Sequence, residues 1–211
     1  LLVGGTCVHE QDIQAARGEA LVQRGHLLRH SDIEVRNLDP ARVFIGQIVQ
    51  QRALFPSDRA DHLPCLFEKL GGNAKAEARM DRFFYNPDGS LAVTKSGGAH
   101  AELDNEPSIA SPWLYDFVGA PWKTQEVVRA AMKEIWTNAP NGISGNDDLG
   151  EMSSWYVWAA LGMYPLYPGG GELVLGSPMF EEAVIDRQGG RVAIHAKGAA
   201  MDTPYISSMS V

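Results

Sequence analysis

The chain has 211 residues, of which 45% are hydrophobic and 21% are charged. This is an ordinary globular composition and excludes wholesale disorder. The 18 basic and 26 acidic residues give a formal net charge of −8, and no basic run offers the positive footprint that nucleic-acid binding requires. The longest strongly apolar run, Trp155 to Leu161, is much shorter than the ~20 residues that span a bilayer. We therefore expect neither nucleic acid nor a membrane as a partner.

The chain begins at Leu1 without a methionine and ends at Val211 in a strand-like pattern, so we expect it to be part of a longer protein. The two cysteines, Cys7 and Cys65, are too few for a disulfide scaffold and do not have the spacing of metal ligands. They are either two buried thiols or one disulfide, and they do not define the cellular compartment.

Residues 1–60 have weak periodicity, and no element is assigned to them. From His62 onward, apolar residues recur at helical spacing and predict five helices, over residues 62–70, 73–84, 108–118, 121–136 and 151–161. Gly71 and Gly72 should end the first helix, because glycine adopts the left-handed conformation at low cost, and Asn73 should cap the second. The fifth helix is apolar on nearly all sides, which predicts burial on most faces.

Glycine and proline residues after Gly162 exclude a long helix, and short alternating patterns predict strands instead. These strands cover residues 173–175, 183–185, 192–194 and 205–206. The segment from Arg187 to Gly190 has the composition of a hairpin turn. The sequence therefore predicts a mainly α protein with short terminal β-strands, divided into a helical part over residues 1–165 and a β-strand segment over residues 166–211.

Two acidic loops each lie just before a predicted helix. The first runs from Asp104 to Pro107 and the second from Gly145 to Gly150, and each contains carboxylates and an asparagine. Such residues either cap the helix or, where two loops meet at one end of paired helices, form a shared site. Clustered carboxylates repel one another and need a proton, a ligand or a cation. Their hard oxygen atoms suit Ca²⁺ better than Zn²⁺.

These loops belong to longer motifs that closely resemble glycoside hydrolase family 92. One motif runs from Gly145 to Val157 and continues through residues 160–165 and 176–180. The other motif lies earlier in the chain and comprises residues 105–108, 112–115 and 121–125. The resemblance extends from about Leu63 to Val211. It implies a calcium-dependent, inverting exo-α-mannosidase. Enzymes of this family have an N-terminal β-sandwich followed by an (α/α)6 barrel, which is a helical toroid. The resemblance implies that this chain is the C-terminal part of that barrel.

The resemblance also implies catalytic and metal-binding roles. Asp148 falls at the position of the general base, and Asn146 falls two residues earlier, where the family often has a second acid that helps to hold the water. Asn105 and Glu106 fall where the family builds its calcium site.

Substrate binding is assigned to Asp147, Trp113 and His100. Each of these residues has a structural alternative. Asp147 either binds the sugar or caps the following helix, Trp113 is either a sugar platform or a core residue, and His100 is either part of the site or a solvated loop residue.

The general acid of the family is a glutamate in a Val-Glu-Gly motif, and the best alignment sets Ile45 at this position. The general acid is therefore not identified, and a second interpretation is a catalytically inactive homologue that binds mannose. The resemblance implies two kinds of partner. One is a mannosyl oligosaccharide, such as α-1,2-linked mannose of N-glycans or mannan, and the other is the N-terminal β-sandwich with the remaining barrel helices. It also implies a secreted or cell-surface protein.

Overall fold

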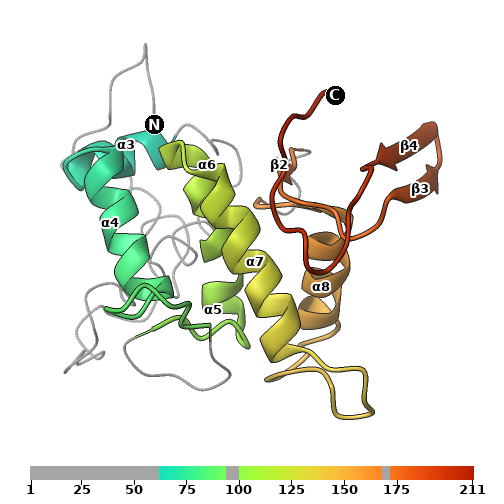
Figure 1. Ribbon diagram of the computed structural model, residues 1–211, viewed down its shortest axis with the longest axis horizontal. Helices are drawn as coiled ribbons and strands as arrows, with labels where there is room; N and C mark the ends of the chain where they lie inside the picture. Colours follow the sequence, from blue (N-terminus) through green and yellow to red (C-terminus); the bar gives the residue numbers. More distant parts are fainter. Residues whose placement is uncertain (1–61, 94–99, 168–171) are drawn as a thin grey trace, which may run out of the picture.

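The computed structural model describes residues 62–93, 100–167 and 172–211 (Figure 1). Its helices come first along the chain: α3 (His62–Lys69), α4 (Asn73–Phe84), α5 (Glu106–Ile109), the 3-10 helix η1 (Ser111–Leu114), α6 (Tyr115–Val118), α7 (Pro121–Ile135) and α8 (Glu151–Leu161). The strands follow: β1 (Met163–Tyr164), β2 (Val174–Leu175), β3 (Glu182–Arg187) and β4 (Gly190–His195). In these ranges the fold is mainly helical with short terminal strands, as predicted. The complete barrel and the division at residue 165 stay predictions.

Helix α7 crosses the middle of the molecule, with α3 and α4 on one side and α8 and the strands on the other (Figure 1). Helix α6 packs against both α4 and α7. The core forms where these helices meet, and its largest fully buried side chains include Trp113, Tyr115, Phe83 and Trp155.

Two glycines separate α3 from α4, as predicted. Gly71 and Gly72 have φ angles of 94° and 96°, in the left-handed region that glycine adopts readily. The Gly72 N–H donates to the Phe67 carbonyl at 2.8 Å, which closes the end of α3. The prediction that Asn73 caps α4 is wrong. Asn73 is the first residue inside the helix, Gly72 precedes it, and no side chain caps this end.

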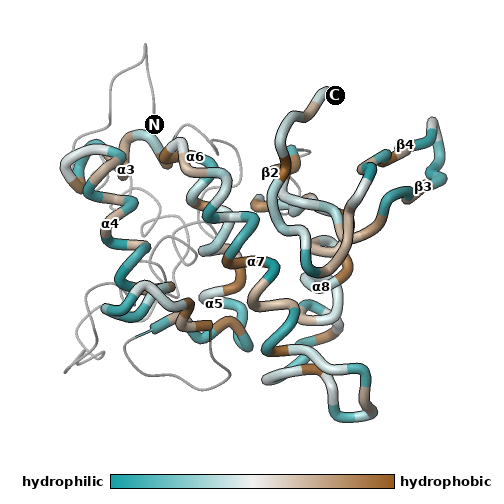
Figure 2. The backbone as a smooth tube through the Cα atoms, viewed as in Figure 1, coloured by the Kyte–Doolittle hydropathy of each residue, from teal (hydrophilic) through white to brown (hydrophobic). Residues whose placement is uncertain are grey.

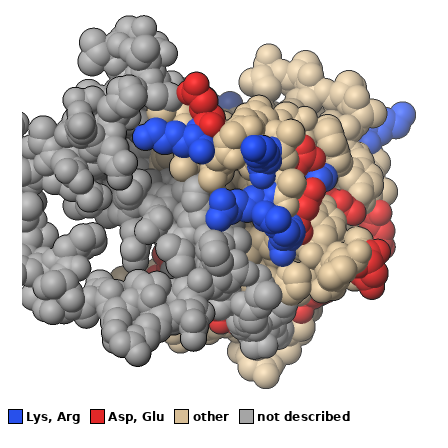
Figure 3. All heavy atoms as spheres, turned by 90° about the vertical axis from the view of Figure 1, so that its left-hand side faces the viewer, with Lys and Arg blue, Asp and Glu red and all other residues tan. Residues whose placement is uncertain are grey.

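Helix α4 has one apolar and one basic face. Met80, Phe83 and Phe84 are buried, as predicted, while Lys75 and Arg82 are exposed. Figure 2 shows the resulting alternation of hydrophilic and hydrophobic residues along α4 and α7. Figure 3, viewed from the α4 side, shows several Lys and Arg side chains close together, with Asp and Glu side chains beside them.

The helix predicted over residues 108–118 is broken into α5, η1 and α6, and it begins earlier, at Glu106. Pro112 explains the break, because it has no N–H to donate to the Ser108 carbonyl four residues before it. The Ser111 hydroxyl donates to that carbonyl instead. The chain therefore tightens into a 3-10 turn before α6 continues in the helical conformation.

Helices α7 and α8 agree with their predicted bounds to within one residue. Trp136, which follows α7, stacks on Trp155 of α8 with ring centroids 4.9 Å apart and planes 10° apart. Met152 and Trp155 of α8 are buried. The prediction that α8 is buried on most faces is only partly confirmed, because Val157 on the same helix is 58% exposed.

The strands form two antiparallel pairs, β1 with β2 and β3 with β4. The predicted hairpin turn is confirmed, since Arg187 pairs with Gly190 and Gly189 between them has a φ of 95°. The strand predicted at residues 205–206 is wrong. The Ile206 N–H donates to Oε1 of Gln125 on α7 at 3.1 Å, so it does not join a β-ladder.

Arg129 of α7 anchors the segment that contains the strands. Its side chain is buried and its guanidinium donates to the carbonyl oxygens of Ser177, Pro178 and Ala200, at 2.9, 3.0 and 2.6 Å. Burial lowers the pKa of this guanidinium, although nearby Tyr156 and Asp202 favour the charged form. One buried cation thus joins three backbone carbonyls of the segment after the helices to α7.

Two sequence predictions concern residues outside the described ranges, namely Cys7 and Ile45. Cys65 is disulfide-bonded, so the interpretation of the cysteines as two buried thiols is wrong. No helix in the described ranges is both long enough and apolar enough to cross a lipid bilayer.

Candidate active site

The two acidic loops predicted to share a site lie against each other. Gly145 has a φ of 63°, and a Cβ added to it would lie only 1.8 Å from the Asp104 carbonyl oxygen. The neighbouring Ser144 is buried, and its hydroxyl lies 3.4 Å from Oδ2 of Asp104, which is a long hydrogen bond. A residue with a side chain at position 145 would separate the loops, so glycine is required there for contact.

The helices that follow these loops are also joined. The indole N–H of Trp155 on α8 donates to the Ile109 carbonyl at the end of α5, at 2.8 Å. Both groups lie in the core, where an unpaired polar group would be costly. This bond fixes the start of α8 relative to α5, and with it the relative position of the loops.

Asn105 and Glu106, the predicted calcium ligands, lie at the start of α5. The Asn105 side-chain oxygen accepts a hydrogen bond from the Glu106 N–H at 3.1 Å, so the capping alternative holds for Asn105. Asn105 is exposed and Glu106 is half-buried. Among the described residues, no group of three or more His, Cys, Asp or Glu side chains is arranged to hold a metal ion.

Asp147 braces the second loop. Its Oδ1 accepts hydrogen bonds from the Ser153 N–H at 2.9 Å and from the Ser153 hydroxyl at 2.7 Å. Its backbone carbonyl accepts from the Glu151 N–H at 2.7 Å. Asp147 therefore satisfies free N–H groups in the first turn of α8, as the capping alternative describes.

Asp148 and Leu149 have backbone conformations that the sequence does not reveal. Their φ angles are 41° and 61°, in the left-handed region, which costs a residue with a Cβ roughly 1–2 kcal/mol. Both side chains are exposed. Strain of this kind persists where the surrounding structure enforces it and is common at functional sites. The loop thus presents the Asp148 carboxylate to solvent immediately after the braced Asp147.

The remaining predicted residues are placed differently. Asn146 is exposed on the second loop, and His100 is half-buried ahead of the first. Trp113 is fully buried, stacks on Tyr164 with ring centroids 5.1 Å apart, and fills the space beside Gly176. This is the core position given above as the alternative to a sugar platform.

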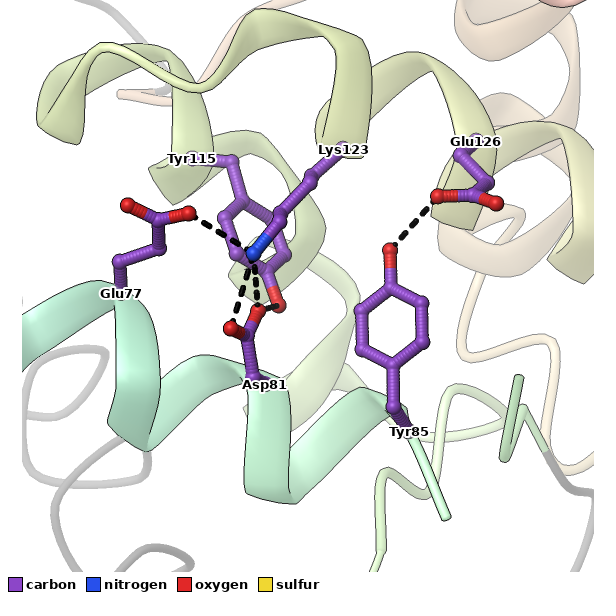
Figure 4. A network of polar contacts seen from close by, with 6 residues as sticks. All are labelled: Glu77, Asp81, Tyr85, Tyr115, Lys123 and Glu126. Atoms are coloured by element: carbon purple, nitrogen blue, oxygen red, sulfur yellow. Dashed lines mark hydrogen bonds and ion pairs between the residues drawn. The ribbon is translucent and has the colours of Figure 1, made fainter. Parts of the chain in front are cut away.

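A network of polar side chains that sequence reasoning missed joins α4 to α6 and α7 (Figure 4). Lys123 of α7 forms ion pairs with Glu77 and Asp81 of α4, each at 2.7 Å. The Tyr115 hydroxyl of α6 donates to Asp81 at 3.0 Å. Burial lowers the pKa of Lys123, but its bonds to Asp81 and Glu77 outweigh burial and raise it. The periodic spacing of Glu77 and Asp81 on α4 is the only sequence signal for this network.

A second bond in the same region links the end of α4 to α7. The Tyr85 hydroxyl donates to Oε2 of Glu126 at 2.8 Å (Figure 4). Burial, followed by the bond to Glu126, raises the pKa of Tyr85. Together these contacts hold α4 against the helices that follow the first acidic loop.

The chain matches the model of the glycosyl hydrolase family 92 catalytic domain over residues 46–211. This match covers most of the chain and includes both acidic loops and all the described helices. The protein therefore belongs to glycoside hydrolase family 92.

Solved structures similar to this chain include two enzymes of Bacteroides thetaiotaomicron. The family GH92 α-mannosidase BT3965 is 28% identical, with a TM-score of 0.54 over 64% of this chain and 18% of its own. The family GH92 inverting mannosidase BT2199 is 33% identical, with a TM-score of 0.56 over 67% of this chain and 21% of its own. The GH92 family glycosyl hydrolase ccman5 is 21% identical, with a TM-score of 0.65 over 82% of this chain and 26% of its own, and indicates the fold alone.

A curated relative, an uncharacterized secreted glycosidase of Arthroderma benhamiae, is 30% identical over 120 residues. The aligned region is 57% of this chain and 14% of the relative. The chain thus spans only a minor part of the length of the relatives that it matches.

Proposed function

We propose that the protein is an exo-acting α-mannosidase that removes terminal mannose with inversion of configuration. The observation that carries this proposal is the loop from Gly145 to Gly150, which lies against Asp104 and presents the exposed carboxylate of Asp148 on a strained backbone. Membership of family 92 and the likeness to the solved structures of two mannosidases support the substrate class. The preferred linkage in this proposal is α-1,2, as in N-glycans or mannan.

In the proposed reaction, Asp148 is the general base. It accepts a proton from a water molecule as the oxygen of that water attacks the anomeric carbon, and the bond to the leaving oxygen breaks on the opposite face of the ring. Asn146, exposed on the same loop, helps to orient the water. The N-terminus of α8 favours the negative charge that a base needs. Asp147 holds this loop rigid through Ser153.

The leaving oxygen must receive a proton from an acid, and in inverting enzymes the acid and base carboxyl groups lie about 6.5–9.5 Å apart. The alignment above sets Ile45 at the position of this acid, outside the described residues. An acid must therefore come from another part of the protein. His100 is proposed to help shape the sugar pocket rather than to transfer protons, whereas Trp113, buried beside Gly176, is a core residue that supports the site from within.

Ca²⁺ is proposed to bind at Asn105 and Glu106. A carboxylate and an amide oxygen are the donors that this ion prefers, but it takes about six to eight oxygen ligands. Two donors fit only part of such a shell, so sugar hydroxyls, water or residues outside the described ranges must supply the rest. When bound, the ion would act as a template that orients the sugar ring.

The proposal extends to the partners and location of the whole protein. The substrate is a mannosyl oligosaccharide, and the helices of this chain are completed by further barrel helices and an N-terminal β-sandwich. The likeness to a secreted glycosidase of Arthroderma benhamiae supports a secreted or cell-surface location. A second candidate function is a catalytically inactive mannose-binding protein, favoured by Ile45 at the aligned position of the acid.

Hydrolysis of an aryl α-mannoside by the full-length protein, with and without added Ca²⁺, tests the proposed function. Release of the aryl group that depends on Asp148 supports the enzyme. Calorimetric binding of mannose without any hydrolysis would support the inactive homologue instead.

A further inference from the structure

Asp116 is a buried carboxylate that the proposed mechanism does not use. It lies in α6, between Tyr115 and Phe117, and α6 packs against α3, α4, η1 and α7. Both of its side-chain oxygens are buried, and no hydrogen bond of ordinary geometry reaches either one. An ionised carboxylate without partners in such a place is strongly unfavourable.

No charged side chain in the described part of the chain compensates Asp116. On α4 and α7, Glu77, Asp81 and Lys123 bind one another (Figure 4). On α7, Arg129 donates to backbone carbonyls of the C-terminal segment, and Glu126 accepts from Tyr85.

The other charged groups of the described helices do not compensate Asp116 either. On α3, Glu68 and Lys69 are exposed, and η1 contains no charged residue. On the remainder of α4 and α7, the charged side chains are Lys75, Arg79, Arg82, Lys133 and Glu134, and none of them affects the ionisation of Asp116.

Thr124 of α7 is the polar side chain that acts on Asp116. Its hydroxyl favours the charged form of the carboxyl slightly, but in the structure that hydroxyl donates its proton to the Pro112 carbonyl of η1 at 3.1 Å. One hydroxyl proton cannot serve both acceptors well. Burial dominates this balance and raises the pKa of Asp116 to about 7.

We propose that Asp116, Thr124 and Pro112 form a pH-sensitive switch that controls how firmly η1 and α6 are held against α7. In the neutral state, the Thr124 hydroxyl donates to the Pro112 carbonyl, as in the structure, and the uncharged Asp116 carboxyl stays buried without a charged partner. When Asp116 loses its proton, Thr124 turns to donate to the carboxylate, and the Pro112 carbonyl loses its partner. Because Pro112 directly precedes Trp113, the switch loosens the turn that carries this core tryptophan.

The direction of the pH effect follows from linkage. The pKa of Asp116 is raised in the folded protein, so the folded state binds this proton more tightly than the unfolded state does. Below about pH 4 both states are protonated and Asp116 costs no stability. Stability is lost progressively as the pH rises to about 7, the folded-state pKa, and the loss is constant at higher pH.

The test compares melting temperatures of the full-length protein from about pH 5 to pH 8.5 for the wild type, Asp116→Asn and Glu134→Gln. Glu134 is exposed on α7 and serves as the control for removing a carboxylate. We expect the difference in melting temperature, Asp116→Asn minus wild type, to increase by roughly 4 °C or more between pH 5 and pH 7. Above pH 7 this difference should stay constant. The Glu134→Gln difference should not depend on pH. Parallel curves for Asp116→Asn and wild type would overturn the switch.

A second variant, at Thr124, tests whether the Thr124 hydroxyl affects the ionisation of Asp116. This test can be read even if Asp116→Asn does not fold. Thr124→Val keeps the shape of the side chain but removes the hydroxyl that favours the charged form. The midpoint of Asp116 ionisation, followed by carbon-13 NMR of the side-chain carboxyl, should therefore move to higher pH. An unchanged midpoint, or a midpoint in the wild type near that of an ordinary aspartate, would contradict the proposal.

Discussion

The carbonyl oxygen of Asp104 lies so close to Gly145 that a Cβ at position 145 would approach it to 1.8 Å. This contact brings together two loops that are 40 residues apart in the chain, since Ser144 also reaches Asp104. It is the structural basis for treating the two acidic segments as one candidate site.

Replacing Gly145 with alanine should separate the loops. The clash with Asp104 adds overpacking, which typically costs about 1–3 kcal/mol, to the cost of a Cβ at a φ of 63°. We expect a clear loss of both stability and mannosidase activity in the full-length protein, measured by thermal unfolding and by hydrolysis of an aryl α-mannoside.

Gly89→Ala is the matched control for this variant. Gly89 has a φ of 83°, but a Cβ added to it would meet nothing within 4 Å. It should lower stability by roughly 1–2 kcal/mol, the cost of a Cβ in the left-handed region, and leave activity unchanged. Equal effects of the two substitutions would show that backbone conformation alone, and not loop contact, matters at position 145.

Asp148→Asn should abolish the proposed base while keeping the shape of the side chain. Loss of a general base typically lowers kcat by about 10²–10⁴-fold, and KM for an aryl mannoside should change little. Asp147→Asn should act mainly on stability, because it weakens the bonds to Ser153 at the start of α8. A larger loss of kcat for Asp147→Asn than for Asp148→Asn would show that the roles are reversed.

Glu106→Gln tests the proposed calcium site. The substitution removes one negative charge from the start of α5, so the affinity for Ca²⁺ should fall and activity should become more sensitive to a chelator. Glu134→Gln removes an exposed carboxylate from α7 and should change neither property. A calcium dependence that is the same in both variants would count against a role for Glu106.

Much of the helical fold could be predicted because its signals are local. Gly71 and Gly72 mark the end of α3, and the apolar spacing of α7 and α8 gives their bounds to within one residue. The predictions failed where one side chain replaces a backbone hydrogen bond. Ser111 takes the carbonyl that Pro112 cannot satisfy, and Gln125 takes the N–H of Ile206.

The candidate site was predictable as two motifs but not as a geometry. Residue types at the starts of α5 and α8 indicated acidic loops, and the contact between Asp104 and Gly145 agrees with the expectation that the loops meet. The left-handed conformations of Asp148 and Leu149 carry no sequence signal, because non-glycine residues rarely adopt them. The ion pair between Lys123 and α4 was missed for a different reason. Asp81 is 42 residues away from Lys123 in the chain, and local patterns do not reveal contacts over such a distance.

Lys123→Met should destabilise the packing of α4 on α6 and α7. The substitution leaves Glu77 and Asp81 as neighbouring like charges without their cation, and we expect a cost of about 2 kcal/mol in urea unfolding. Lys133→Met is the control, because the ion pair of Lys133 with Asp202 is exposed to solvent, and its loss should cost about 0–1 kcal/mol. Similar costs for the two lysines would contradict the structural role of the network.

The stereochemistry of hydrolysis tests the central claim most directly. Proton NMR of the full-length protein acting on the methyl glycoside of α-1,2-linked mannobiose can record the anomer released before mutarotation, because only the cleaved mannose then has a free anomeric carbon. An inverting mannosidase that uses Asp148 as its base should release β-mannose first, and Asp148→Asn should release almost none. Initial release of α-mannose, or undiminished release by Asp148→Asn, would contradict the account.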